Sequence, residues 1–384
     1  MGLISSLDIG TYRLVMALAD KEEGRRFHLR ELYSAVSSGI VGGRIVDEKE
    51  FAQAFGKLVQ KITDSRPIDE IHIGLSEASL RVKRVNPVVS IKKKVTDRDI
   101  KAVKSKAWET GYTDDDVIID VCPDYYSVDG GCEVADPLGM DGRTLEMAAR
   151  VYYAGRDYLH GIRNVLSEYM GGELYFYPLS RACIEVADSD KEEGFAWVDL
   201  GDYSLRAWMF ERGLLRGKAE FPIGMDILAF DIMSAFGLTK EQALKIQEAD
   251  AEALKSDYKN KKVIIPDIKV SVEGSDLALV TQCRMEELLE GVLLYLRKSG
   301  LDNNPDYPVV ISGGGACLKG VDGLLERMSG HLVTYPDMKK FKSFDEDLLN
   351  SPADVSALGL LLCTYGRPEK EGTDFWMRIK KWFN

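Results

Sequence analysis

The sequence has few of the residues on which metal sites and disulfide frameworks depend. Its six cysteines are scattered, no two of them form a C-x-x-C pair, and only four histidines occur in 384 residues. A structural zinc site needs cysteines and histidines at short, regular spacing, so we do not expect one. Isolated cysteines fit a reducing cytoplasm better than an oxidising compartment.

Long hydrophobic runs are also missing. No stretch reaches the roughly 18 apolar residues of a membrane-spanning helix, and the N-terminus lacks a basic flank followed by an apolar signal core. The formal net charge is −12. Residues 82–95 are basic, but no Lys/Arg cluster of the size that phosphate neutralisation requires stands out, so nucleic acid is not an expected partner.

The composition is otherwise globular, with 45% hydrophobic and 29% charged residues, and the length allows two core-bearing lobes. Residues 3–20 contain two apolar runs split by Gly10 and Thr11, which predicts a β-hairpin with Asp8 at the end of its first strand. Residues 195–224 repeat this pattern around Asp199 and Gly201. Two copies of this β-hairpin pattern predict two similar lobes.

Between these hairpins, residues 48–63 have the apolar periodicity of an amphipathic helix. The composition of the sequence changes over residues 81–155, which predict a small inserted α+β subdomain with a helix capped at Thr96. Farther along, helices are expected around 226–256 and 282–300, on either side of a polar β-rich stretch near 261–280. An apolar strand, three glycines and a helix follow from residue 308.

Two Asp-x-Gly hairpins followed by a strand, a glycine triplet and a helix resemble the layout of the actin and sugar-kinase superfamily. Members of that superfamily hold nucleotide phosphates between the two hairpins and rest the adenosine on the glycines, where a side chain would block close approach. Three stretches narrow the resemblance to the bacterial cell-division family FtsA: GIVGGRIVD at 39–47, DPLGMDGRTLE at 136–146 and EFPIGMD at 220–226.

This resemblance implies an α/β, actin/Hsp70-like fold of two ribonuclease-H-like lobes, with an inserted α+β subdomain of the 1C type and a C-terminal amphipathic helix. The expected divisions are 1–80 and 156–193 for subdomain 1A, 81–155 for 1C, 194–228 and 301–365 for 2A including a closing helix, 229–300 for 2B, 366–373 for a linker, and 374–384 for the terminal helix.

The resemblance also implies a nucleotide site, formed by Asp8, Gly10, Thr11, Tyr12, Arg13, Asp199, Gly201, Asp202, Gly313, Gly314 and Gly315. Asp8 and Asp199 would hold Mg²⁺ if Mg-ATP binds. The family's second hairpin reads D-x-GGGTTD, whereas Asp202 and Tyr203 stand here in place of two glycines. A carboxylate about 4 Å from a phosphate costs roughly 4 kcal/mol, so weak or absent ATP binding is expected, unless Mg²⁺ bridges Asp202 to the phosphate.

Other departures affect the same ligand. Tyr12 replaces a small serine, and Cys183 replaces the glutamate near the attacking water in family members. The ribose-contacting Glu and Lys fall on Leu244 and Gln247, although a shift of register would place Glu241 and Lys245 there. We therefore expect no catalytic residues and at most a residual ATPase activity.

Residues 374–384, DFWMRIKKWFN, predict an amphipathic helix with its apolar side chains within an arc of about 120° and its cations on the other side. The expected membrane-contacting residues are Phe375, Trp376, Arg378, Ile379, Lys380, Lys381, Trp382 and Phe383. The alternative is a terminal helix that docks on the protein's own core.

The resemblance implies a peripheral protein on the cytoplasmic face of the membrane at the division site, which tethers filaments of the tubulin-like FtsZ and helps recruit the divisome. Expected partners are the C-terminal peptide of FtsZ, bound on 2B near Arg284, copies of this chain in a filament, anionic lipids, and other division proteins through 1C. Two alternatives remain: a PilM-like scaffold of type IV pilus assembly, which would lack the amphipathic tail, and a small-molecule kinase or phosphatase with Asp202 as base.

Overall fold

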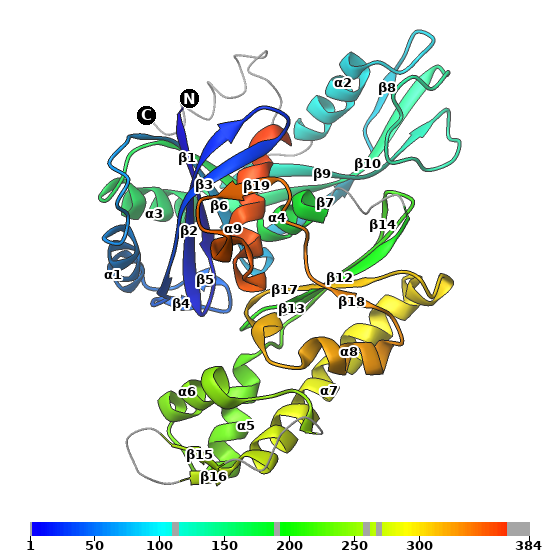
Figure 1. The fold of residues 1–384 in the computed structure, drawn as a ribbon. Helices are drawn as coiled ribbons and strands as arrows, with labels where there is room; N and C mark the ends of the chain where they lie inside the picture. The colour runs from blue at the N-terminus through cyan, green and yellow to red at the C-terminus, as the bar shows by residue number, and fades with distance from the viewer. Residues whose placement is uncertain (1, 110–114, 188–192, 256–261, 266–270, 367–384) are drawn as a thin grey trace.

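The computed structural model describes residues 2–109, 115–187, 193–255, 262–265 and 271–366 and contains two lobes, each built on its own β-sheet (Figure 1). The amphipathic segment expected at 374–384 and the linker after Gly366 lie outside the described residues. Within those described ranges, no helix combines the length and apolar character needed to cross a membrane.

The first lobe contains a six-stranded sheet, in the order β11 (Glu173–Pro178), β6 (Ile68–Leu75), β1 (Leu3–Ile9), β2 (Arg13–Glu22), β3 (Arg26–Val36) and β19 (Phe341–Ser343). β1, β2 and β3 form an antiparallel meander, whereas β1, β6 and β11 run parallel. Parallel neighbours need crossover connections, and these contain α1 (Glu48–Val59) and α3 (Arg156–Ser167), which pack on one face of the sheet. A two-residue pair, β4 (Ile40–Val41) and β5 (Arg44–Ile45), precedes α1.

The second lobe repeats this arrangement. Its five strands lie in the order β14 (Leu214–Phe221), β13 (Leu205–Glu211), β12 (Phe195–Leu200), β17 (Val309–Ser312) and β18 (Val333–Thr334). Again the first three strands are antiparallel, and the last two run parallel to the first strand of the meander. The expectation of two similar ribonuclease-H-like lobes is confirmed.

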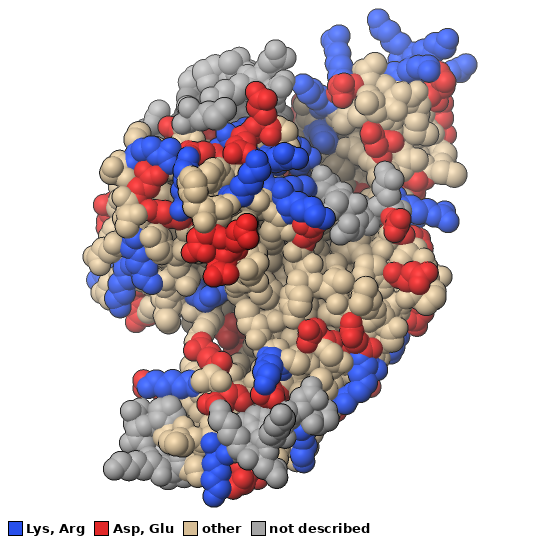
Figure 2. Space-filling view, viewed as in Figure 1, with Lys and Arg blue, Asp and Glu red and all other residues tan. Residues whose placement is uncertain are grey.

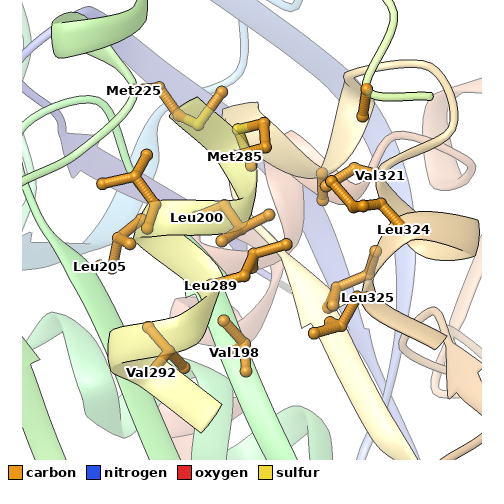
Figure 3. Close-up of a cluster of buried hydrophobic side chains, with 14 of the residues drawn as sticks. Val198, Leu200, Leu205, Met225, Met285, Leu289, Val292, Val321, Leu324 and Leu325 are labelled. Carbon is orange, nitrogen blue, oxygen red and sulfur yellow. The ribbon is translucent and has the colours of Figure 1, made fainter. Parts of the chain in front are cut away.

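Helices α7 (Gly274–Lys298) and α8 (Val321–Ser329) cover the outer face of the second sheet. α5 (Asp226–Phe236) and α6 (Lys240–Asp250) pack on each other below the sheet in Figure 1, and α5 contacts α7. Figure 3 shows Val198 and Leu200 of β12 facing Leu289 of α7 and Leu324 of α8 within one buried cluster. Because side chains alternate along a strand, the intervening Trp197 and Asp199 face the first lobe.

The polar stretch expected to be β-rich near 261–280 is helical in its last seven residues. Only β15 (Lys262–Ile264) and β16 (Ser271–Glu273) are strands there, and α7 begins at Gly274. The prediction of strand after Gly274 is wrong because Leu277, Ala278 and Met285 recur at helical spacing and form part of the buried side of α7.

Two short helices fill the space between the sheets. α4 (Leu179–Val186) and α9 (Val355–Leu362) pack on each other, and all eight residues of α9 are buried. A helix that is apolar all round has to be buried. Residues of both sheets complete this shared core, including Phe27 from the first lobe and Trp197 and Trp208 from the second.

The inserted subdomain has its own sheet and core. β10 (Thr144–Gly155) pairs with β9 (Asp116–Val128) on one side and with β7 (Arg81–Val85) and β8 (Val88–Ser90) on the other. α2 (Asp97–Trp108) packs on this sheet through Val103 and Ala107. Thr96 caps α2 in a capping box with Asp99, as its sequence predicts.

A buried ion pair joins the two lobes and the inserted subdomain. Lys218 of β14 donates hydrogen bonds to Glu77 at 2.6 Å, to Tyr152 of β10 at 2.8 Å and to Ser180 of α4 at 2.9 Å. Burial alone would raise the pKa of Glu77, but Lys218 and Ser180 bring it below its ordinary value. Both side chains are almost inaccessible, at 13% for Lys218 and 8% for Glu77, so neither charge has water to replace its partner.

Replacing Lys218 by methionine should destabilise the protein by about 3–5 kcal/mol, because it leaves the Glu77 charge buried without its counter-charge. Urea unfolding followed by tryptophan fluorescence measures the change.

The double variant Lys218→Met with Glu77→Gln is the matched control. It should recover most of that loss, because it leaves no unpaired buried charge. Equal destabilisation by the single and double changes would contradict the assignment.

Candidate functional site

A cavity of about 890 Å³ lies between the lobes, where the two Asp-x-Gly hairpins face each other. Its walls come from the β1–β2 turn, the β12–β13 turn, α6 and the glycine triplet after β17. All eleven residues expected at a nucleotide site line it: Asp8, Gly10, Thr11, Tyr12, Arg13, Asp199, Gly201, Asp202, Gly313, Gly314 and Gly315.

The two hairpin turns share one backbone device. A side chain at Gly10 would lie 2.6 Å from the carbonyl oxygen of Arg13, and one at Gly201 would lie 2.5 Å from that of Ser204. Both turns therefore require glycine at the same place. The strands thereby bring Asp8 and Asp199 to corresponding positions on opposite walls of the cavity.

The glycine triplet packs tightly against the end of β12. Gly313 has φ +88°, and a side chain at Gly315 would lie 2.7 Å from Leu200 and from Met225. Gly314 differs, because no atom lies within 4 Å of the place where its side chain would start. The cavity therefore has an open, backbone-lined surface at this end.

Arg206 lines the cavity beside Asp199. Its guanidinium is buried and forms an ion pair with Asp199 at 2.7 Å, while Asp199 also accepts a hydrogen bond from Ser312 at 2.8 Å. Burial would lower the pKa of Arg206, but Asp199 and other acidic neighbours raise it, so the residue carries a permanent charge. A protein cation therefore already neutralises Asp199.

Asp8 lies beside this ion pair and is nine-tenths buried. Burial, opposed by the charge of Arg206 and reinforced by that of Asp199, raises its pKa to about 7. Its Oδ1 atom has no hydrogen-bond partner among the described residues. Near neutral pH the carboxyl is therefore protonated in a large fraction of molecules and presents a polar group to the cavity.

The two tyrosines that depart from the family's hairpin pattern reach across the cleft. Tyr12 of the first lobe donates a hydrogen bond to Glu248 of α6, and burial together with this contact raises the pKa of Tyr12 to about 12. Tyr203 of the second lobe lies over Gly42 in the β4–β5 turn, where a side chain on the glycine would be 3.1 Å from its ring. Each hairpin thus touches the opposite lobe.

Asp202 stands at the tip of the second hairpin. Burial and the nearby Asp226 raise its pKa to about 6, with Lys240 opposing. Its carbonyl oxygen accepts a hydrogen bond from the backbone N–H of Asp226 at 3.0 Å. At physiological pH its carboxylate adds negative charge to the end of the cavity that the phosphates of a nucleotide would enter.

The residues that line the cavity differ in chemistry from one part of it to another. The open face of Gly314 and the apolar Leu244 and Leu318 fit the adenosine end. At the phosphate end, Arg206 is committed to Asp199, and Arg13 to Asp354 at 3.0 Å. Among the described residues no group of three or more His, Cys, Asp or Glu is arranged to hold a metal ion.

The structure separates the other residues proposed from the sequence. Leu244 and Gln247 line the cavity, and the Oε1 atom of Gln247 is buried there without a described hydrogen-bond partner. The alternative pair does not line the cavity, since Glu241 and Lys245 are paired with each other along α6 at 3.4 Å. Cys183 lies in the core between the lobes.

Arg284, expected to contact a partner, lies on α7. It donates to Asp231 of α5 at 3.0 Å and to Glu287 at 2.6 Å, and its side chain is 19% exposed. The eight residues expected to contact membrane, within 374–384, lie outside the described part of the chain.

Sequence reasoning missed the partners that close the cleft. Glu248 is 236 residues from Tyr12, and no local pattern connects them. Lys218 carries a weak signal, because a lysine facing inward in the otherwise regular strand 214–221 needs a buried counter-charge.

A protein-family model matches the inserted subdomain. The sequence model described as "SHS2 domain inserted in FTSA" matches residues 78–153. Most of the chain is similar to the cell division protein FtsA of Bacillus subtilis, with 25% identity covering 84% of this chain and 76% of that protein. The FtsA protein of Streptococcus pneumoniae is 26% identical, covering 86% and 74%.

Solved structures share the fold. A chain of the PilM-PilN type IV pilus biogenesis complex superposes with a TM-score of 0.66 at 15% identity, covering 95% of this chain and 99% of that one. MreB5 of Spiroplasma citri bound to ADP superposes with a TM-score of 0.51 at 10% identity, covering 94% and 95%. The actin-like two-lobed architecture with an inserted domain is therefore confirmed.

Asp8→Asn should stabilise the protein above about pH 7.5 and have a smaller effect near pH 4. In the unfolded chain the carboxyl loses its proton near 3.8, whereas the folded protein keeps it until about 7. The folded state therefore binds more protons between these values, and stability falls as pH rises through them. Asparagine cannot ionise, so the gain at alkaline pH is up to about 4 kcal/mol.

Urea unfolding at both pH values measures this difference, with Asp306→Asn, an exposed carboxylate, as the matched control. A stability change for Asp8→Asn that is the same at both pH values would contradict the burial of an ionisable proton at this position.

Proposed function

We propose, from the premise that this chain is an FtsA-type actin-like cell-division protein, that it tethers FtsZ filaments to the cytoplasmic membrane and helps recruit the divisome. The observation that carries the proposal is an actin-like body with the FtsA-type domain inserted at residues 78–153. The protein acts at the division site, on the inner face of the membrane.

The attachment to the membrane is assigned to residues 374–384. Three cations and five large apolar residues alternate there in a helical pattern. The cations contribute about 3 kcal/mol at an anionic leaflet, which makes one such segment a reversible anchor. Several anchors in a filament of this chain hold more firmly, since each bound copy raises the effective concentration of the next.

FtsZ is held through its C-terminal peptide on the part of the second lobe that contains α5 and α7. Arg284 supplies the positive charge for an acidic peptide. Its ion pair with Asp231 orients the guanidinium, so the peptide shares or replaces an existing carboxylate contact. Other division proteins contact the inserted subdomain.

The tether works with weak or no ATP binding. Asp202 and Tyr203 take the place of glycines, and Arg206 supplies the positive charge that a magnesium ion would bring. The contacts of Tyr12 with Glu248 and of Tyr203 with Gly42 hold the lobes together in the absence of a nucleotide. Any ATPase activity is residual.

A second candidate is a scaffold of the PilM kind, favoured by the TM-score of 0.66 to the PilM-PilN complex. That similarity concerns the fold, because the identity is 15%. A membrane-binding tail distinguishes the two candidates.

Deleting residues 374–384 should lower sedimentation with phosphatidylglycerol-containing vesicles by more than about 100-fold, because the three cations alone contribute about 3 kcal/mol. The same deletion should leave binding of the FtsZ C-terminal peptide unchanged. Arg284→Ala should leave sedimentation with vesicles unchanged and weaken binding of the FtsZ peptide about tenfold, as expected for a lost charge-assisted hydrogen bond.

Asp231→Asn is the matched control for Arg284, because it removes the internal ion pair and keeps the arginine. Peptide binding that falls equally in Asp231→Asn and Arg284→Ala would assign Arg284 a purely structural role. Unchanged sedimentation of the tail deletion would favour the pilus scaffold or a tail that docks on the protein itself.

The double variant Asp202→Gly with Tyr203→Gly should bind Mg-ATP more tightly than the parent, by up to roughly a thousandfold, because it removes a carboxylate from the phosphate end. Fluorescence titration with a nucleotide analogue measures the dissociation constants. Tyr203→Gly alone is the control that opens space without removing charge, and it should gain much less. Micromolar binding by the parent chain would overturn weak nucleotide binding.

A further inference from the structure

Positive charge is concentrated in one segment of this acidic chain. Residues 81–106 contain ten lysines and arginines and two aspartates. Their net charge is +8 in a chain of net charge −12, which leaves −20 on the rest. The expectation that no sizeable Lys/Arg cluster exists is therefore wrong, because the overall charge conceals this segregation. Figure 2 shows lysines and arginines projecting from the inserted subdomain.

Five exposed cations form one surface of the inserted subdomain. They lie in the loop between β8 and α2 and on the solvent side of α2, opposite its buried Val103 and Ala107. We refer to them as the α2 face: Lys92, Lys93, Lys94, Arg98 and Lys101. Lys94 lies 4.0 Å from Asp141, whereas Lys92 and Lys93 have no described carboxylate within ion-pair distance.

The loop that carries the lysines is held by residues 136–146, one of the three stretches that resemble FtsA. Lys93 accepts a backbone hydrogen bond from Gly142 at 2.9 Å, and Val95 donates one to Met140 at 2.9 Å. Ile91 donates another to Arg143 at 2.7 Å. The lysines therefore project from an ordered backbone, which gives their charges a fixed place on the molecule.

The described chain ends on the side of the molecule where α2 lies (Figure 1). Tyr365 lies under Lys21, 4.4 Å from the ring centroid, and next to Arg25. Arg25 pairs with Glu185 of α4 at 2.7 Å. Cys363, at the end of α9, and Lys104 of α2 both lie within electrostatic range of Glu185 and of its neighbour Arg181. In Figure 1 the red end of α9 and α2 accordingly lie on the same side of the molecule.

We propose that the α2 face contacts the anionic headgroups of the bilayer, as a second membrane-binding element in addition to the tail. This rests on the proposed function, because the tail brings the protein to the membrane. The described chain ends on the same side of the molecule as α2, and the linker 366–373 can span at most about 28 Å when extended. A tail bound to lipid therefore keeps this side of the protein close to the surface.

The composition of the face favours lipid over a folded protein partner. Four of its five cations are lysines, which are point charges on flexible stems and lack the planar fork that matches a fixed carboxylate. Headgroups in a fluid leaflet have no fixed positions, so lysines suit them. Each lysine near such a surface contributes about 1 kcal/mol.

The test is sedimentation of the full chain with vesicles of phosphatidylcholine, with and without phosphatidylglycerol. The double variant Lys92→Glu with Lys93→Glu should partition at least about 30-fold less onto the anionic vesicles, the equivalent of two lost lysine contributions of about 1 kcal/mol each. It should match the parent on neutral vesicles. Lys49→Glu with Lys57→Glu, two exposed lysines on α1, is the control of equal charge change.

The outcomes separate the two proposals. A parent chain that does not sediment, or a tail deletion without effect, overturns the membrane tether. A parent that binds through its tail, with the Lys92 and Lys93 variant equal to the α1 control on anionic vesicles, overturns the α2 face alone. Unchanged partitioning with loss of self-association, or of binding to duplex DNA, would reassign the face to a second copy or to nucleic acid. Thermal melting of each variant verifies that it is folded.

Discussion

Buried positive charge at the junction of the lobes determines how this protein is assembled. Arg206 and Lys218 lie on neighbouring strands of the second sheet and face the first lobe. Arg206 is neutralised by Asp199 of its own lobe, and Lys218 by Glu77 of the other. Separating the lobes would part Lys218 from Glu77, and a buried charge without its partner is costly. The relative position of the lobes is therefore a property of the chain itself.

Side chains also connect the two lobes across the cleft. In an actin-like protein the two hairpins face a shared ligand, and small residues in the turns leave room for it. Here the larger side chains Tyr12 and Tyr203 span the gap and contact Glu248 and Gly42 directly. The glycines that shape the turns remain, because Gly10 and Gly201 pack against backbone carbonyls whether or not a ligand is present. The backbone of the two turns is thus kept, while larger side chains stand at the tips of the hairpins.

Much of this arrangement could be predicted from local patterns. The duplicated hairpin with Asp8 and Asp199, the glycine triplet and the cap at Thr96 are written in short stretches and lie where expected. The helical character of 274–280 was missed, because polar residues interrupt a pattern whose buried positions become evident only against the second sheet. The Tyr12–Glu248 and Lys218–Glu77 contacts could not be predicted, since they join segments more than 140 residues apart and depend on how the lobes meet.

The long hairpin of β9 and β10 has a mechanical consequence. Tyr152, which accepts a hydrogen bond from Lys218, lies near the body end of β10, and Thr144 lies at its outer end. Eight residues of strand separate them, or about 27 Å. The inner end of the inserted subdomain thus contacts the ion pair between the lobes. A rotation of the subdomain by about 10° around that end moves its outer end by about 5 Å. A force applied to the outer end would therefore act as a torque on the contact between Tyr152 and Lys218.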